Sequence, residues 1–329
     1  MRKTIRSKIL ACFFPTLFCL VMVMVSCETD PEIYLPSNPR PLIYGIFNSN
    51  DTIHYLKVGK SFGADIDPKL DARIYDSLYF NEVKVSVFRS VNGDPSGSAL
   101  PLTRITNWPK DSGYFHFPGQ IMYQFDDRLK TGVYVSVEVP GLPKAEAYTR
   151  IARTGIIYQP DSASMYVYLV PQQAWLIQWG GNPWNEIDVS FEFIEDYGDS
   201  VFNSQYVHIQ KTNYFESEYE KYREMKVTYE EFIREVLQQI TPNDKVKQVF
   251  LGYISITIHG GDENMVNYIK YKDGFNDFGV VEFSNVTNGI GLLASRSTEI
   301  RDSLRFDYST RQQLINENKL RVLKISKWN

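Results

Sequence analysis

Alternating apolar and polar residues, the pattern of half-buried β-strands, dominate the chain after its first forty residues. The clearest case is residues 132–139, where four valines at every second position would share one face. Between residues 42 and 154 we expect short strands at 42–47, 52–58, 83–88, 99–105, 113–117, 121–125, 132–139 and 144–150. Strands of this length, separated by turn residues and without a convincing helix, predict an immunoglobulin-like β-sandwich over residues 42–154.

Residues 155–329 predict a second β-rich domain that also carries one or two packed α-helices. Its strand candidates are 165–170, 174–179, 187–194, 204–210, 246–259, 280–286, 290–293, 304–308 and 320–326. Asn288 and Gly289 lie between two of these runs and supply the positive φ angles that a tight hairpin turn needs. The fold expected for the whole chain is therefore mainly β, in two domains divided near residue 154.

The strongest helix candidate is residues 228–241. Thr228 and Glu231 form a capping box at its start, and Pro242 follows its end. An apolar stripe at helical spacing, typical of a helix packed on a sheet, consists of Tyr229, Phe232, Ile233, Val236, Leu237 and Ile240. A shorter helix is expected at 262–272, and residues 213–225 also place aromatic residues at helical spacing.

The first 26 residues have the layout of a lipoprotein signal peptide rather than of a folded element. Four basic residues precede an uncharged, mostly apolar run from 9 to 25, which is followed by Ser26 and Cys27. We expect cleavage before Cys27 and acylation of its thiol, although Met24 departs from the usual leucine at that position. The alternative is a retained membrane helix, but 17 residues interrupted by Pro15 are at the lower limit for crossing a bilayer.

Residues 27–41 predict an extended tether between this anchor and the first domain. The segment is rich in proline, which favours a polyproline-like path of about 3.1 Å per residue and a reach of roughly 40 Å from the lipid. Glu28, Asp30 and Glu32 follow the cysteine closely. They are either a solvated charge run or the kind of acidic signal that directs some lipoproteins to the cell surface, and the sequence leaves both open.

Charge and cysteine content narrow the classes of function. Without residues 1–26 the chain keeps 31 basic and 39 acidic side chains, a net charge of −8, which argues against a nucleic-acid partner. All three cysteines lie at or before position 27, so once Cys27 is acylated no thiol is left for a disulfide, a zinc site or catalysis. The four histidines, at positions 54, 116, 208 and 259, are far apart in the sequence, and we expect no metal site and no cofactor.

Several short motifs carry a resemblance to a known family. Segments 42–47, 228–241 and 280–296, taken together with the expected lipid-attachment site, resemble a family of Bacteroidota lipoproteins built on a domain of unknown function. Residues 132–137 also look like the carboxypeptidase-regulatory and transthyretin type of sandwich. The resemblance implies an envelope lipoprotein, of a kind often found near nutrient-uptake receptors, and it transfers no catalytic residue.

Two motifs invite a catalytic interpretation that their context does not favour. The stretch His-Gly-Gly-Asp-Glu-Asn at 259–264 overlaps a signature of diguanylate cyclases, which are cytoplasmic enzymes. A strand that ends at the two glycines, followed by Asp262 as a helix cap, explains it better. Glu192, Asp196 and neighbouring acidic residues could contain a glycosidase pair, yet we expect a solvated loop there. No Gly-x-Ser-x-Gly motif occurs.

Tryptophans provide the best candidates for a binding site. Trp175 and Trp179 share one face of an expected strand and should pack in the core. Trp184 lies instead in a loop-like segment between Asn182 and Asn185, where an exposed indole can stack on a sugar or a peptide beside a hydrogen-bonding amide. The alternative is a tryptophan that folds back over the end of a sandwich.

These observations predict a non-catalytic binding or accessory lipoprotein, anchored in the outer membrane through Cys27, on its periplasmic or cell-surface side. The expected partners are the membrane itself and an outer-membrane receptor for the uptake of a glycan or peptide. A structural surface component, such as an adhesin or a fimbrial subunit, is the alternative, and a hydrolase is a third reading.

Overall fold

The computed structural model describes residues 39–61, 72–109, 119–215, 222–273 and 284–327. The predicted signal peptide, Cys27, His116 and all but the last residues of the predicted tether lie outside these ranges. The described chain is mainly β, as the sequence predicts, and its strands form three sheets. None of the described helices combines the length and the apolar character needed to cross a membrane.

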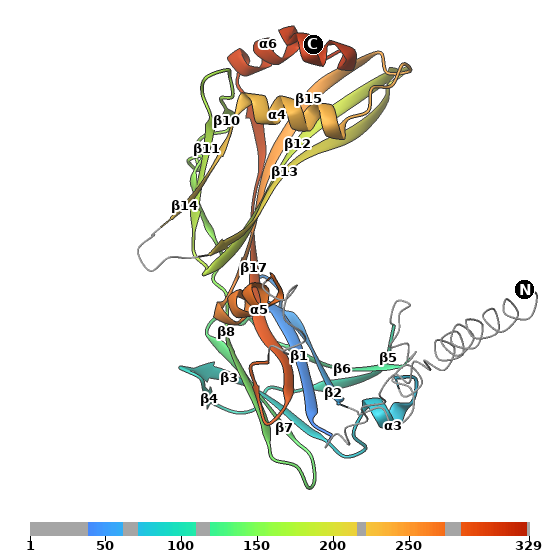
Figure 1. Ribbon diagram of the computed structural model, residues 1–329, viewed down its shortest axis with the longest axis vertical. Helices are drawn as coiled ribbons and strands as arrows, with labels where there is room; N and C mark the ends of the chain where they lie inside the picture. The colour runs from blue at the N-terminus through green and yellow to red at the C-terminus, as the bar shows by residue number, and fades with distance from the viewer. Residues whose placement is uncertain (1–38, 62–71, 110–118, 216–221, 274–283, 328–329) are drawn as a thin grey trace, which may run out of the picture.

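Figure 1 shows an elongated molecule of two lobes joined by a narrow waist. The lower lobe contains β1 to β8, the upper lobe contains β10 to β15 with α4 and α6, and β17 passes through the waist. The largest sheet has the order β13-β12-β15-β17-β1-β2-β6-β5. One continuous hydrogen-bonded sheet therefore extends through both lobes.

The lower lobe is a β-sandwich around one apolar core. One sheet contains β1 (Pro41–Asn48), β2 (Ile53–Lys60), β5 (Thr103–Trp108), β6 (Gln120–Asp126) and the start of β17 (Ile290–Phe306). The other sheet has the order β16-β8-β7-β3-β4. Its strands are β3 (Lys84–Val91), β4 (Asp94–Ser96), β7 (Gly132–Glu138), β8 (Ala145–Arg150) and β16 (Val286–Thr287). The short helix α3 (Tyr75–Leu78) lies beside β2. The valines of β7 at 133, 135 and 137 are fully buried, as their alternation predicts.

The upper lobe packs a long sheet against a small sheet and helices. Its long strands are β12 (Trp184–Gly198), β13 (Val201–Phe215), β15 (Gln248–Gly261) and the end of β17. The short strand β10 (Tyr166–Val167) pairs with β17. Against them pack β9 (Ile156–Gln159), β11 (Trp175–Gly180) and β14 (Arg223–Val227), helices α4 (Tyr229–Gln239) and α6 (Tyr308–Asn316), and the 3-10 helix η1 (Asn318–Leu323). The rings of Phe191, Phe232 and Phe306 meet between these layers, with centroids 4.7 to 5.8 Å apart.

Helix α4 confirms the strongest helical prediction. The Thr228 hydroxyl accepts a hydrogen bond from the Glu231 amide at 3.1 Å, which satisfies one of the free donors at the start of the helix. Phe232 and Val236 are fully buried, whereas Leu237 is 43% exposed although it belongs to the predicted stripe. The second predicted helix is α5 (Glu263–Asp273), which lies at the waist.

Strand β17 joins the two lobes. Its first residues pair in parallel with β1, from Ile290 beside Leu42 to Arg296 beside Asn48. From Arg296 onward the same strand pairs antiparallel with β15. The strands predicted at 290–293 and 304–308 are therefore parts of one 17-residue strand. Through β16 and β17, residues 286–296 of the second predicted domain complete the sandwich of the first.

Three predictions about single elements are wrong. Residues 213–215 belong to β13 and 223–225 to β14, so the described part of the segment with helical spacing is strand. Tyr308 does not continue a strand but begins α6, because the Asp307 carboxylate accepts hydrogen bonds from the Ser309 and Thr310 amides and caps the helix. Residues 318–323 form a 3-10 helix and not the expected closing strand. Each local pattern was compatible with two structures, and packing selected the other one.

Candidate functional site

The predicted ligand loop lies at the waist, and its two asparagines are buried there. Trp184 is the first residue of β12, and its indole packs with Met265 and Leu292. Asn182 and Asn185 are only 2% and 0% exposed. The two amides that were expected to be accessible are therefore buried at the junction between the lobes, and the tryptophan between them is half-buried rather than exposed.

The two asparagine side chains satisfy polar groups where the lobes meet. Asn182 Nδ2 donates to the Arg153 carbonyl at 2.7 Å and to Ser297 Oγ at 3.0 Å, and Asn185 Nδ2 donates to the Asn182 carbonyl at 2.9 Å. A Cβ at Gly260 would lie 2.1 Å from Asn182 Nδ2, so only glycine permits this close approach. The amide donors therefore serve the junction rather than a ligand.

The Gly-Gly-Asp-Glu stretch has the structural role that the sequence predicts. Strand β15 ends at Gly261, and the Asp262 carboxylate accepts a hydrogen bond from the Met265 amide in the first turn of α5. The same carboxylate accepts from the Ser295 amide at 3.2 Å and from the Thr149 hydroxyl at 2.6 Å. Burial raises the pKa of Asp262 above its ordinary value, and these hydrogen bonds offset part of the shift.

Glu192, Glu195 and Asp196 lie on β12 and not in the predicted solvated loop, whereas Asp199 lies in the turn that follows this strand. Glu192 and Asp196 are four residues apart on one face of β12, which separates their Cα atoms by about 13 Å. A glycosidase pair needs carboxyl groups about 5 to 9.5 Å apart. Glu195 lies on the opposite face, is 3% exposed, and accepts hydrogen bonds from the side chains of Tyr197 and Gln205. The hydrolase reading gains no support from this arrangement.

The three described histidines are held by different contacts. His54 is buried and packs against two phenylalanine rings, and His259 contacts a threonine hydroxyl. His208 is exposed, and its Nδ1 lies 3.0 Å from the Asp188 carboxylate. Within the described ranges, no three His, Cys, Asp or Glu side chains are grouped as a metal site requires.

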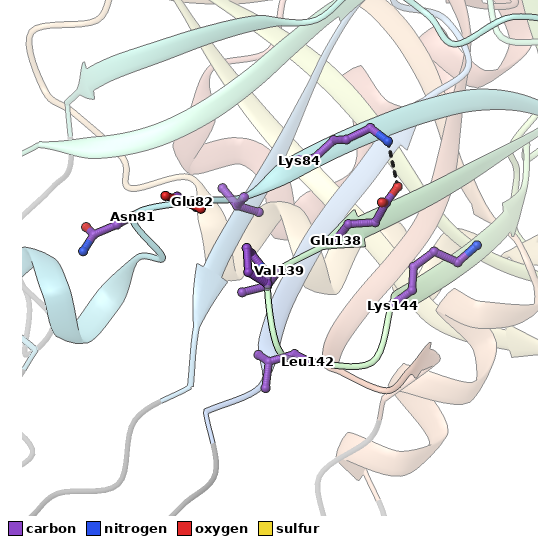
Figure 2. A pocket seen from close by; sticks show the side chains of 9 residues that line it. Asn81, Glu82, Lys84, Glu138, Val139, Leu142 and Lys144 are labelled. Atoms are coloured by element: carbon purple, nitrogen blue, oxygen red, sulfur yellow. Dashed lines mark hydrogen bonds and ion pairs between the residues drawn. The ribbon is translucent and has the colours of Figure 1, made fainter.

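An open groove of about 730 Å³ lies in the lower lobe, between the start of β3 and the β7–β8 turn (Figure 2). Three of its four charged groups are held in ion pairs: Lys84 pairs with Glu138 at 3.0 Å across neighbouring strands, and Lys144 pairs with Glu146 beside the groove. Exposed pairs of this kind interact weakly and neutralise one another. The groove therefore offers few groups that would select a ligand.

A second exposed surface is the outer face of the long sheet in the upper lobe. Helix α4 and the β14-β11-β9 sheet pack on one side of β12, β13, β15 and β17. On the other side α5 packs against the waist end, at Trp184 and Gly261, and no described helix or strand covers the rest (Figure 1). We call this uncovered part the outer face. Its residues alternate along each strand with buried core residues, and they include Glu192, Tyr206, His208, Tyr253 and Arg305.

Contacts between neighbouring strands fix the side chains of the outer face. The Arg305 guanidinium lies 4.6 Å from the centre of the Tyr253 ring, and its Nη2 donates to the Tyr253 hydroxyl at 2.5 Å. Glu192 Oε1 accepts from the Ser204 hydroxyl at 2.7 Å. The face thus combines aromatic rings, hydroxyls and charges of both signs, which is chemistry suited to holding a polar ligand.

Sequence patterns alone could not identify this surface. Tyr206 and Tyr253 each precede a buried β-branched residue, so alternation marks them as outward-facing strand residues. Their position on one face depends on the pairing of β12 with both β13 and β15, which joins segments far apart in the chain. The signal that the sequence did contain is a large aromatic residue, tyrosine, at strand positions where alternation predicts an exposed polar residue.

These features define the chain as a mainly β protein of the sandwich type. No family model matches it, and no curated protein matches it. Among solved structures, the C-terminal globular domain of an oligosaccharyltransferase from Pyrococcus abyssi is similar over 82% of this chain, with 9% identity and a TM-score of 0.19. The chain spans 48% of that structure.

Proposed function

We propose that this protein is a lipid-anchored binding or accessory protein of the outer membrane, which holds a ligand on the outer face of its upper lobe. The observation that carries the proposal is the joint exposure of Tyr206, Tyr253 and Arg305 on the part of the sheet face that no described helix or strand covers. Large aromatic side chains beside fixed polar groups are typical of binding surfaces, because they supply contact area with little loss of side-chain entropy.

In this proposal the N-terminal segment attaches the protein to the outer membrane. Acylation at Cys27 would fix the protein to the membrane, and the tether would lead to the lower lobe at Pro41, where β1 begins. The upper lobe lies on the other side of the waist (Figure 1). A ligand on the outer face would therefore be held away from the lipid, where an outer-membrane uptake receptor could receive it.

A structural surface component is the second candidate. Adhesin and fimbrial subunits that assemble by strand addition require an open strand edge. At the edge strand β13, the Gln239 side chain from α4 accepts a hydrogen bond from the His208 amide and donates one to the His208 carbonyl, both at 2.8 Å. These are the backbone groups that an added strand would use at that position, so ligand binding on the face is the better-supported role.

Two measurements test the proposal. Metabolic labelling with a fatty-acid probe should modify the wild-type protein and leave the Cys27→Ala variant unlabelled. Affinity purification from native outer membranes should recover a partner or polymer that a Tyr206→Ala/Tyr253→Ala variant no longer retains. Equal labelling of the Cys27→Ala variant would remove the anchor, and identical recovery with both proteins would remove the binding face.

A further inference from the structure

Register brings three exposed tyrosines into one line across the outer face. Tyr206 on β13 lies opposite Glu192 on β12, whose Oε2 accepts a hydrogen bond from the Tyr253 amide on β15 at 3.1 Å. Arg305 on β17 contacts the Tyr253 ring and lies opposite Tyr166 on β10. The sequence across five neighbouring strands is Tyr206, Glu192, Tyr253, Arg305 and Tyr166, which we call the tyrosine row.

The spacing within the tyrosine row is regular. Each tyrosine is two strands from the next, and neighbouring strands are about 4.8 Å apart, so the tyrosine positions recur at about 10 Å. The side chains of Tyr206, Tyr253 and Tyr166 are 52%, 46% and 62% exposed. This repeat is close to the length of two pyranose units in an extended chain, so successive rings would meet every second sugar.

Two of the three rings are held in place before any ligand binds. The Arg305 contact described above fixes the Tyr253 ring. The Tyr206 ring lies 6.5 Å, centre to centre, from the ring of His208, which is itself bound to Asp188. A surface that is already ordered loses little conformational entropy on binding, and this raises affinity for a given contact area.

Charges in and beside the tyrosine row select the class of ligand. Glu192 and Asp188 would repel a polyanion, while Arg305 between two tyrosines would repel a polycation. Hydroxyl groups, in contrast, can both accept from the guanidinium and donate to the carboxylate. The matching ligand is therefore uncharged and rich in hydroxyls, and it has apolar C–H faces that stack on aromatic rings.

We propose that the tyrosine row binds an extended neutral polysaccharide, whose sugar rings stack on Tyr206, Tyr253 and Tyr166 while its hydroxyls bond to Glu192 and Arg305. This inference names the ligand of the outer face and rests on the proposed binding function. A peptide that added a strand to the sheet would need backbone groups at an edge, whereas the row crosses the strands on their face.

Affinity electrophoresis of the purified protein in native gels tests this inference. The gels contain one soluble polysaccharide each: a linear β-glucan, a xylan, a galactomannan or an α-glucan, with polygalacturonate as the charged comparison. We expect at least one neutral polymer to retard the wild-type protein, and the Tyr253→Ala substitution to weaken that binding about tenfold. Tyr253→Phe should retain most of the binding, because it keeps the ring.

The matched control is Tyr158→Ala. Tyr158 has the same 46% exposure as Tyr253 but lies on β9, in the small sheet away from the outer face. Its loss should leave binding unchanged, and urea unfolding should show that all variants fold, because exposed side chains contribute little to the free energy of unfolding. If Tyr253→Ala unfolds the protein, Tyr166→Ala makes the same test at the other end of the row.

Three results would overturn the inference: no neutral polymer retards the wild-type protein, polygalacturonate alone does so, or Tyr253→Ala and Tyr158→Ala bind equally. Recovery of a partner from outer membranes could still depend on the outer face in each of these cases. That outcome would leave the proposed function standing with a different ligand, so the two failures are distinguishable.

Discussion

Asp262 shows how one buried side chain can hold several elements together. Its carboxylate accepts hydrogen bonds from Thr149, Ser295 and Met265, and so connects β8, β17 and the first turn of α5. A carboxyl group out of water is costly unless such partners satisfy it. Because all three donors lie at the waist, the residue stabilises the junction rather than either lobe alone.

Two substitutions at Asp262 should therefore differ in how much they lower the free energy of unfolding, because only one of them removes the hydrogen-bonding group. Asp262→Ala leaves three donors without their acceptor and should lower the free energy of unfolding by about 3 kcal/mol. Asp262→Asn keeps an acceptor for the two amides and can donate to the Thr149 hydroxyl, so it should cost less than about 1 kcal/mol. Urea unfolding measures both values, and equal losses would contradict the assigned role.

The raised pKa of Asp262 predicts a pH dependence with a defined sign. An unfolded aspartate has a pKa of about 3.9, so above that value and up to the raised folded pKa the folded protein binds more protons than the unfolded chain. The stability contributed at Asp262 is complete below about pH 4 and is lost as pH rises through the folded pKa. When pH is lowered from about 7 to about 4, the free energy of unfolding of the wild-type protein should therefore rise relative to that of Asp262→Asn. Urea unfolding of both proteins at the two pH values measures this difference.

At the scale of elements, α4 connects local sequence to the core of the upper lobe. Thr228 starts the helix, and Phe232 places its ring 4.7 Å from Phe191 and 5.4 Å from Phe306. The helix also carries Gln239 to the edge of β13. A single 11-residue element thus has a cap, a buried face and a contact that occupies part of an open strand edge.

Two substitutions in α4 should differ widely in cost. Phe232→Ala removes a fully buried ring from the centre of the core and should lower the free energy of unfolding by about 3–5 kcal/mol. Leu237→Ala changes a side chain that is 43% exposed and should cost less than about 1 kcal/mol. Thermal or urea unfolding of the two variants provides the comparison. Similar losses would mean that the helix is not packed as described.

At the scale of the whole molecule, the lobes share a strand instead of a flexible linker. The parallel pairing of β1 with β17 joins residues near 45 to residues near 293, and Leu293 is fully buried in the core of the lower lobe. The sandwich near the N-terminus therefore cannot be completed until almost the entire chain is present. Pairing at such sequence separation slows folding, because the loop must be closed before its contacts form.

Fragments provide the corresponding test. Residues 39–154 alone lack β16 and β17, so β1 would lose its parallel neighbour and the core would lose Leu293. We expect this fragment not to fold cooperatively in urea or thermal unfolding followed by circular dichroism. The same fragment with residues 284–300 joined to it should recover a cooperative transition. Cooperative unfolding of the shorter fragment would show that β17 is dispensable for the lower lobe.

Local chemistry by itself determined much of the secondary structure. Alternation predicted β7 and the strands that form β1 and β2, and the capping box predicted α4. These features depend on residues within a few positions of one another. Asn288 adopts a positive φ of 55°, but the strands on either side of it do not form the predicted hairpin, because β16 pairs with β8 and β17 pairs with β1. Where packing could choose between two local structures, as at 308 and 318–323, the prediction failed.

Only the tertiary structure decided which residues are accessible and which strands are neighbours. Trp184, Asn182 and Asn185 look like a surface loop in the sequence, yet their burial follows from contacts with residues about 30 to 115 positions away. The tyrosine row likewise exists only because the register of five strands aligns side chains from distant segments. A side chain's neighbours along the chain set its local geometry, whereas burial and shared faces are set by the sum of long-range contacts.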